Sequence, residues 1–266
     1  MNKVILFLFV SLLTNTICAQ FSETVSSDRP GQAFAPNSVG KYVIQSQTGI
    51  DFGGYSGNAN STGNSIAPNT FIRYGITKKI ELNTAWEFRN DSYKDNNFES
   101  STNGLSFSSV GTRLNVFEGN GNSPAIGILA LVKLPILAQS YNFNNIAPRL
   151  LVIAGGSLSE KFAYILNFGI DFDGNGTSPS GLYVANLGYS ISPKFSTFIE
   201  NYGSFGSNYF DHRFDTGLGY LINNNIQLDI YGGFGNNNDT IDYFTSLGVT
   251  WRITSIRDKH LNNQPN

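Results

Sequence analysis

Residues 80–89 read IELNTAWEFR, and apolar and polar side chains alternate along them. A period of two is typical of a β-strand with one apolar and one polar face. Residues 42–52 (YVIQSQTGIDF) and 162–173 (FAYILNFGIDFD) repeat the alternation. In the second of these, Phe168 lies on the apolar face, whereas Asn167 falls on the other. The chain is therefore predicted to contain amphipathic strands.

Similar segments recur along most of the chain. The alternation is weakest in 125–135 and 147–158, where it turns Leu129 and Leu131 toward the polar face. We expect twelve strands, at residues 41–54, 70–77, 80–89, 105–117, 125–135, 147–158, 162–173, 181–191, 195–203, 212–221, 226–235 and 241–253.

The connections between these segments alternate in length. One set is short, around residues 78–79, 118–124, 159–161, 192–194 and 222–225. The other set is longer and rich in Gly, Asn and Ser, at residues 55–69, 90–104, 136–146, 174–180 and 204–211. Short turns on one side and long loops on the other are typical of outer-membrane barrels. An even number of strands places both termini at the short-turn, periplasmic side.

Composition excludes several classes of protein. Charged residues are only 14% of the chain, against about 25% in soluble domains, and aromatic residues are another 14%. Few residues are strong helix formers, which argues against helical bundles and α/β enzymes. The formal net charge of −2 gives no basic surface for nucleic acid.

Residues 1–19 read as a secretory signal peptide. Lys3 precedes the apolar run Val4–Leu13, which is too short to cross a bilayer core of about 30 Å. We expect cleavage after Ala19, which would also remove Cys18, the only cysteine. No later apolar run approaches the length of a membrane helix, so the exported chain is a soluble β-protein or an outer-membrane barrel.

The outward faces favour the barrel over a soluble sandwich or jelly roll. A soluble protein would not place large apolar residues on the outer face of twelve consecutive strands. Aromatic residues also cluster at both strand ends, as at two membrane interfaces. They are Tyr189, Phe195, Tyr220 and Trp251 at the short-turn end, and Phe52, Phe88, Phe172, Tyr183 and Phe234 at the other. We predict an all-β, transmembrane, antiparallel up-and-down barrel of about 12 strands at residues 41–253, followed by a polar tail at 254–266.

The polar faces would line the lumen. They carry equal numbers of acidic and basic residues, which argues against a strongly ion-selective pore. They either pair into a network that fills a narrow barrel or line a polar path for a solute. The lumen-facing residues are predicted to be Asp51, Arg73, Glu81, Glu87, Arg89, Arg113, Lys133, Arg149, Asp171, Glu200, Arg213, Asp215, Asp229 and Arg252.

Residues 20–40 precede the first strand and contain the polar stretch Ser26–Gln32. One interpretation is a periplasmic lead-in. The other is a plug or gate folded into the barrel mouth, with Asp28 and Arg29 paired to lumen charges and Pro30 fixing the backbone.

The sequence holds little that suggests catalysis or cofactors. Asp211 and His212 are the only acid–histidine pair that an outer-membrane lipid hydrolase could use. The sequence does not indicate which serine would be the nucleophile beside them. His260 falls in the polar tail. No Cys/His cluster suggests a metal, and we expect no cofactor.

Several motifs resemble those of a known family, the outer-membrane transporters named for the MetA pathway of phenol degradation. The resemblance begins at SDRPGQ (27–32) and covers most of the chain after the signal peptide. It departs from the family at Gln45–Gln47, where a glutamate is common, and after Ile253. The other matching motifs are YGIT (74–77) with Glu81, KLP (133–135), LNFG (166–169), ENYG (200–203), QLD (227–229), and DYF (242–244) with Gly248 and WR (251–252).

The resemblance implies a barrel that transports small, often hydrophobic compounds. Our first hypothesis is therefore a monomeric barrel in the cell outer membrane of a gram-negative-type bacterium, with both termini periplasmic. Its partners would be outer-membrane lipids, a small-molecule solute of unknown identity and the barrel-assembly machinery during insertion. The alternatives are a closed structural or loop-display barrel without transport, and the lipid hydrolase.

Overall fold

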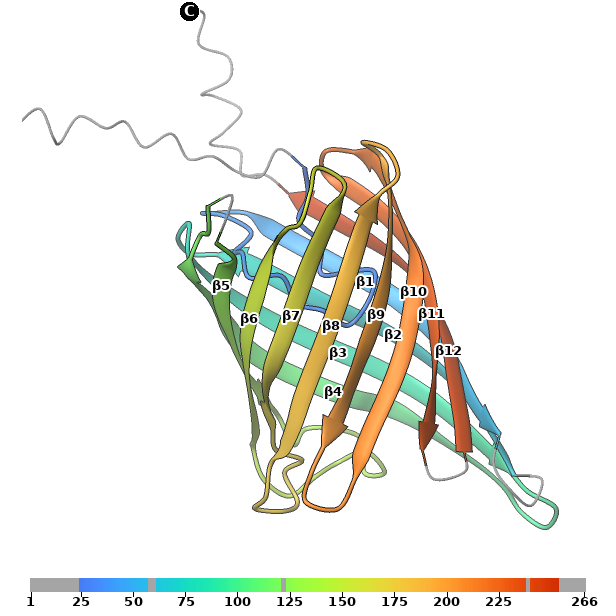
Figure 1. Ribbon diagram of the computed structural model, residues 1–266. Helices are drawn as coiled ribbons and strands as arrows, with labels where there is room; N and C mark the ends of the chain where they lie inside the picture. Colours follow the sequence, from blue (N-terminus) through green and yellow to red (C-terminus); the bar gives the residue numbers. More distant parts are fainter. Residues whose placement is uncertain (1–23, 57–60, 121–122, 238–239, 254–266) are drawn as a thin grey trace, which may run out of the picture.

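The computed structural model describes residues 24–56, 61–120, 123–237 and 240–253, and the strands among them form one closed antiparallel barrel (Figure 1). Each strand pairs with its neighbours in the chain, and β1 pairs with β12 to close the sheet. The strands are β1 (Ile44–Ser56), β2 (Thr62–Gly75), β3 (Ile80–Lys94), β4 (Glu99–Phe117), β5 (Ala125–Lys133), β6 (Ala147–Ser157), β7 (Phe162–Asp171), β8 (Ser180–Ser190), β9 (Phe195–Phe205), β10 (Phe210–Asn223), β11 (Ile226–Asn237) and β12 (Thr240–Ile253). The predicted twelve-stranded up-and-down barrel is confirmed.

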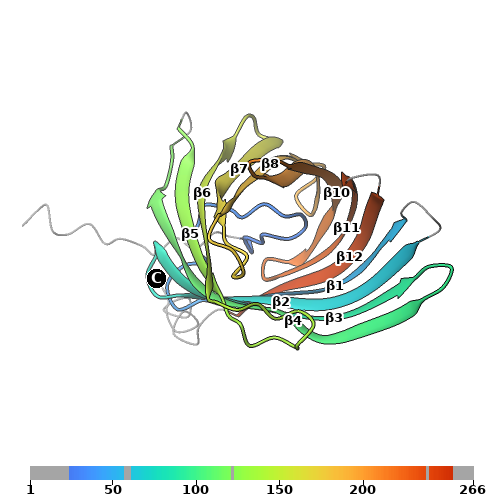
Figure 2. The same cartoon turned by 90° about the horizontal axis from the view of Figure 1, so that it is seen from below.

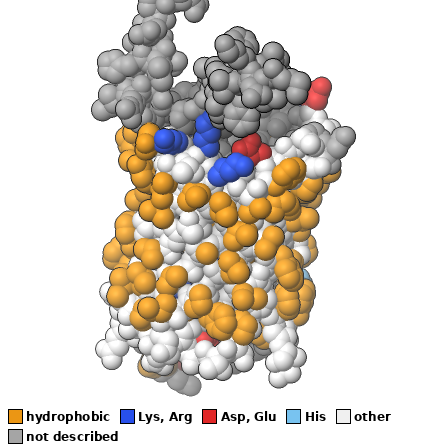
Figure 3. Space-filling view, turned by 90° about the vertical axis from the view of Figure 1, so that its left-hand side faces the viewer, with side chains coloured by type: hydrophobic (Ala, Val, Ile, Leu, Met, Phe, Trp, Pro, Cys, Tyr) orange, Lys and Arg blue, Asp and Glu red, His pale blue; other side chains and the backbone are white. Residues whose placement is uncertain are grey.

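The two faces of each strand differ sharply in exposure. In β3, Leu82, Trp86 and Phe88 are exposed on the outside, whereas Glu81 and Asn83 are buried. Figure 3 shows hydrophobic side chains spread over the wall on one side of the barrel. A soluble protein has the opposite distribution, with apolar side chains inside and polar ones outside. Apolar side chains on the outside suit a lipid bilayer, because they then face acyl chains.

Aromatic side chains pair near both ends of the wall. Phe162 and Tyr189 have ring centroids 4.8 Å apart, and Phe195 and Tyr220 have centroids 4.5 Å apart, at the end that carries the short turns. Toward the opposite end, Tyr183 stacks on Phe210 at 5.8 Å. Amphipathic rings at both ends suit two interfaces between lipid and water.

Two of the predicted long loops are wrong. Residues 62–69 of the first belong to β2, and the second shrinks to residues 95–98 because β3 and β4 both continue into it. Outward positions there are polar, such as Asn64 and Asn103, so the apolar alternation fades while the hydrogen-bonded ladder persists. We refer to this end of the barrel as the loop end; its longest connections are residues 134–146 and 172–179.

The opposite, short-turn end carries the connections at residues 76–79, 118–124, 158–161, 191–194 and 224–225, and β1 starts and β12 finishes there. The predicted signal peptide at 1–19, residues 20–23 of the predicted lead-in and the tail at 254–266 lie outside the described residues. No helix among the described residues is long and apolar enough to cross a membrane.

Part of the inner wall is apolar. Leu129 and Leu131 of β5 and Leu151 and Ile153 of β6 face inward and are buried. We call these four residues the leucine wall. Phe34, from outside the strands, packs against it together with Ile165 and Leu182. Strands β5 and β6 alternate poorly because both of their faces are apolar.

Candidate lumen site

Residues 24–40 run inside the barrel, where Figure 2 shows them enclosed by the ring of strands. We call them the lumen segment. Val25 fixes its start, because its backbone N–H donates to the carbonyl of Asn224 at 2.8 Å in the turn between β10 and β11. Val25, Ala33, Ala35 and Val39 are buried. The segment therefore occupies the half of the lumen nearest the short turns.

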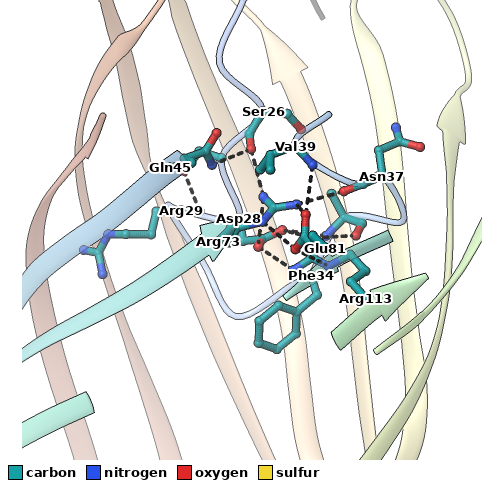
Figure 4. Close-up of polar contacts among 12 residues, drawn as sticks. Ser26, Asp28, Arg29, Phe34, Asn37, Val39, Gln45, Arg73, Glu81 and Arg113 are labelled. Carbon is teal, nitrogen blue, oxygen red and sulfur yellow. Dashed lines mark hydrogen bonds and ion pairs between the residues drawn. The ribbon is translucent and has the colours of Figure 1, made fainter. Parts of the chain in front are cut away.

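Asp28 lies at the centre of a buried charge cluster (Figure 4). Both of its carboxylate oxygens bind the Arg113 guanidinium, at 3.0 and 2.7 Å, and Arg73 approaches to 3.4 Å. Glu81 contacts the same two arginines, at 2.8 Å to Arg73 and 3.4 Å to Arg113. We call Asp28, Arg73, Glu81 and Arg113 the Asp28 cluster. Its two positive and two negative charges balance, as burial requires.

The Asp28 cluster also holds the backbone of the lumen segment. Glu81 accepts the N–H of Val39 at 2.8 Å, and Asp28 accepts that of Ala35 at 2.8 Å. Arg113 donates back to the Ala35 carbonyl at 2.8 Å. Arg73 donates to the carbonyls of Asn37 and Ser26, at 2.8 and 3.1 Å. These charge-assisted hydrogen bonds tie the segment to β2, β3 and β4.

Arg29 forms a second anchor on β11 and β12. Its guanidinium binds Asp229 at 3.0 Å and the Ser246 hydroxyl at 2.7 Å, and it lies 5.3 Å from the Tyr231 ring. Two glycines make room for it: a Cβ on Gly248 would lie 2.3 Å from Arg29 Nε, and one on Gly49 would be almost as close. The next residue, Pro30, lies beside Gly219 of β10.

Glu200 of β9 forms a third anchor. Its carboxylate accepts the backbone N–H groups of Gln32 at 2.7 Å and Ala33 at 3.2 Å, and the Asn186 amide at 2.8 Å. Asp215 of β10 is the cross-strand partner of Glu200 and is also buried. The matched Glu-x-Tyr-Gly motif thus supplies a hydrogen-bond acceptor to the lumen segment.

The remaining predicted lumen residues mostly form pairs nearer the loop end. Asp171 bridges Lys133 and Arg149, both at 2.9 Å. Glu87 binds Arg89 at 3.0 Å. The other contacts are those of Arg213 with Asp211 and Asp242, of Asp51 with Asn69 and Ser246, and of Arg252 with Asn225 and the Thr24 carbonyl.

Uncharged side chains that are not among the predicted lumen-facing residues also hold the lumen segment. Asn167 accepts from the backbone N–H of Phe34 at 2.7 Å and donates to its carbonyl at 2.9 Å. Gln45 donates to Ser26, and Gln227 donates to Arg29. Alternation places these amides at inward strand positions, but it shows only that the positions are polar and not what the amides bind.

Among the described residues, three cavities lie around the lumen segment. A vestibule of about 710 Å³ at the loop end is lined by Arg89, Arg213 and Asp242 among others. A mid-lumen cavity of about 410 Å³ lies against Phe34. A third cavity, of about 470 Å³, is lined by Pro36 and by residues 118–120 and 123–124 of a short-turn connection. The vestibule and the mid-lumen cavity share lining residues such as Asp51 and Glu87, so they adjoin.

The candidate hydrolase pair is not assembled. Asp211 accepts a hydrogen bond from Arg213 at 3.2 Å, whereas His212 stacks on Phe210 on the outer face, with centroids 5.8 Å apart. Consecutive residues of a strand point to opposite faces, which keeps these two side chains apart. Among the described residues, no three His, Cys, Asp or Glu side chains gather as metal ligands would.

Comparison with solved structures finds outer-membrane barrels. The COG4313 outer membrane channel from Pseudomonas putida F1 is 13% identical, with a TM-score of 0.66 over 85% of this chain and 100% of that chain. The translocator domain of the autotransporter NalP from Neisseria meningitidis is 12% identical, with a TM-score of 0.52 over 85% of this chain and 90% of that one. The KdgM porin is 13% identical, with a TM-score of 0.51 over 77% of this chain and 99% of that one. At these identities the likeness is one of fold.

Comparison with curated proteins finds no match. A family model does match, over residues 27–253, and the match begins within the lumen segment and ends with β12. It therefore includes the Asp28 cluster, both other anchors and the whole barrel. The chain belongs to the family described as "Putative MetA-pathway of phenol degradation".

Proposed function

We propose that this protein transports small apolar or aromatic solutes across the outer membrane. The observation that carries the proposal is the mid-lumen cavity, which is of ligand size and mainly apolar although it lies inside a polar barrel. Its apolar lining includes Phe34, Phe71, Phe107, Leu131, Leu151 and Leu182. A lumen that passed only water-soluble compounds would have no need of such a lining.

Two polar groups in the cavity favour a solute that carries an oxygen. Gln47 and Ser109 are lining residues of the cavity, and Gln47 Nε2 and Ser109 Oγ are buried and have no hydrogen-bond partner among the described residues. A phenolic or alcoholic hydroxyl could pair with one of the two, and such groups are costly to leave unpaired. Phenol-like compounds agree with the description of the family.

The same proposal assigns an orientation and partners. The short-turn end, with both barrel termini, would face the periplasm, and the vestibule would face the outside. The exposed apolar wall would contact outer-membrane lipids. The chain would act as a monomer, inserted by the barrel-assembly machinery, and the lumen segment would serve as a plug or gate through Asp28, Arg29 and Pro30.

Uptake of a fluorescent apolar probe tests the proposal. N-phenyl-1-naphthylamine is poorly fluorescent in water and bright among phospholipids, and a lipopolysaccharide leaflet slows its passage. We expect vesicles with lipopolysaccharide outside to brighten several-fold faster when they contain the full-length barrel. Swelling in a sugar solution should stay close to that of protein-free vesicles.

A matched pair of variants ties the result to the cavity. Ala85→Phe adds a ring at an inward position that lines the cavity, whereas Ala130→Phe adds the same ring to the outer face of β5. The first should slow probe uptake and the second should leave it unchanged. A wild-type barrel that does not speed uptake over protein-free vesicles would overturn the proposed function.

A closed structural barrel is the second candidate. It is favoured by the Asp28 cluster, because balanced buried charges that also hold backbone groups are typical of a filled interior. Fast probe uptake that Ala85→Phe slows would exclude this candidate.

A further inference from the structure

The lumen segment separates two cavities. Ala33 and Phe34 line the mid-lumen cavity, whereas Ala35, Pro36 and Asn37 line the third cavity toward the short turns. A solute that moves along the barrel from one cavity to the other therefore passes residues 33–37, and the way in which they are held decides where it passes.

On one side the segment is held by charges. Asp28 binds Arg113 and Arg73 there, and Arg29 binds Asp229. These partners lie on β2, β4 and β11, and their side chains are almost fully buried. Moving this side would separate buried ions, which is strongly unfavourable.

On the other side the contacts are mainly apolar. Phe34 packs on the leucine wall and meets Phe71 edge-to-face, with ring centroids 5.8 Å apart. Asn167 alone supplies the two hydrogen bonds to the Phe34 backbone described above, and neither involves an ion. The Phe34 ring also lies 5.6 Å from the Arg113 guanidinium. An apolar solute can replace the contacts that Phe34 makes with the leucine wall, because dispersion contacts do not depend on one particular partner.

Pro36 continues this apolar side toward the third cavity. A Cβ on Gly155 would lie 3.2 Å from the Pro36 ring, and one on Gly127 would lie 2.6 Å from the Pro36 carbonyl oxygen. These two glycines lie on β5 and β6, the strands of the leucine wall, and leave the inner wall beneath the proline without side chains.

We propose that the solute passes between Phe34 and the leucine wall. Phe34 and Pro36 shift away from β5 and β6, while Ala35 keeps its hydrogen bonds to Asp28 and Arg113 and the Arg29 anchor stays docked. Phe34 is then the gating residue, and Asn167 is the positioning residue that returns it to its place. This inference rests on the proposed function. It also gives a reason for apolar selectivity, because an ion would have to leave water along an apolar wall.

Two engineered disulfides separate local movement from release of the whole segment. The hydroxyls of Ser27 and Thr250 lie 2.6 Å apart, so S27C/T250C can lock the charged side to β12. P36C/G155C can lock the apolar side to β6. Both are made in the full-length chain with Cys18→Ser, and formation of each disulfide is checked by mass spectrometry.

We expect oxidised P36C/G155C to slow uptake of N-phenyl-1-naphthylamine several-fold and a reductant to restore it. Oxidised S27C/T250C should match the wild type. Loss of uptake in oxidised S27C/T250C would overturn the inference, because the whole segment would then have to move. Unchanged uptake in oxidised P36C/G155C would overturn it too, since the route would lie elsewhere. If even the wild type does not speed uptake, the proposed function fails, and this route fails with it.

Discussion

At the scale of single residues, Asp28 is the acidic residue of the lumen segment and contacts two buried arginines. Arg73 and Arg113 are completely buried, and without Asp28 they would share only Glu81. Removing one partner from a buried ion cluster leaves an uncompensated charge, which is far more costly than the cluster is stabilising.

We therefore expect Asp28→Ala to lower the free energy of unfolding by about 3–5 kcal/mol, measured by urea titration of the refolded barrel in detergent. Glu99→Gln is the control. Its ion pair with Lys94 spans 3.9 Å, with both side chains mostly exposed, and such pairs are worth about 0–1 kcal/mol. Equal effects of the two substitutions would contradict the burial argument.

The sequence predicted which residues share a face but not which of them meet. Alternation alone places Arg73 and Glu81 on the polar faces of their strands. That Asp28 would lie between Arg73 and Arg113 depends on strand tilt and on the path of an irregular segment, and neither follows from a period of two. The role of Asn167 was missed because a neutral amide at an inward position looks like ordinary lumen polarity.

At the scale of elements, the strands were easier to predict than the loops. The apolar alternation gave β3 its correct start at Ile80 but not its end at Lys94. Outward side chains past Phe88 need not be apolar. The apolar alternation therefore ends at the edge of the membrane core, whereas the strand continues beyond it. Strands β5 and β6 were hard to predict for another reason. Their inner faces are also apolar and pack against Phe34, so apolar and polar residues do not alternate along them.

The loop at residues 134–146 is held by Tyr141. Its one hydroxyl proton lies within hydrogen-bond reach of two acceptors, Asp91 at 2.9 Å and the Thr102 carbonyl at 3.1 Å. A hydrogen bond to a charged acceptor is worth about 1.5–3 kcal/mol, and less where water competes. Tyr141→Phe should therefore speed amide hydrogen exchange within 134–146 at neutral pH. Tyr189→Phe, at the short-turn end, is the control and should leave that loop unchanged.

The same contact predicts a pH dependence. Burial, together with the hydrogen bond to Asp91, raises the pKa of Tyr141 to about 12, from about 10 in model peptides. The stabilising contact is then fully present below pH 10 and is lost as pH rises through 12. A difference titration of tyrosine absorbance between wild type and Tyr141→Phe should show one phenol ionising near pH 12. Ionisation near pH 10 would mean that the Asp91 contact is weak.

At the scale of the whole molecule, twelve strands enclose more space than inward side chains fill on their own. Eight strands are filled by side chains, and sixteen to eighteen leave a channel. In this protein the lumen segment occupies the intermediate space, anchored on β2, β3 and β4, on β9, and on β11 and β12. The barrel closes through the pairing of β1 with β12, to which the lumen segment contributes no strand. The barrel and the lumen segment are therefore separate structural parts.

This separation predicts that deleting residues 24–40 leaves a folded barrel that conducts ions. The deletion removes one acid, Asp28, and one base, Arg29, so we expect a larger, steady conductance in planar bilayers with little ion selectivity. The full-length chain should conduct weakly. A synthetic peptide of residues 24–40 should reduce the conductance of the deletion variant from the short-turn side only. Equal, high conductance of both proteins would mean that the lumen segment does not obstruct the path of ions, and a heat-modifiable band on a gel would confirm that the deletion variant is folded.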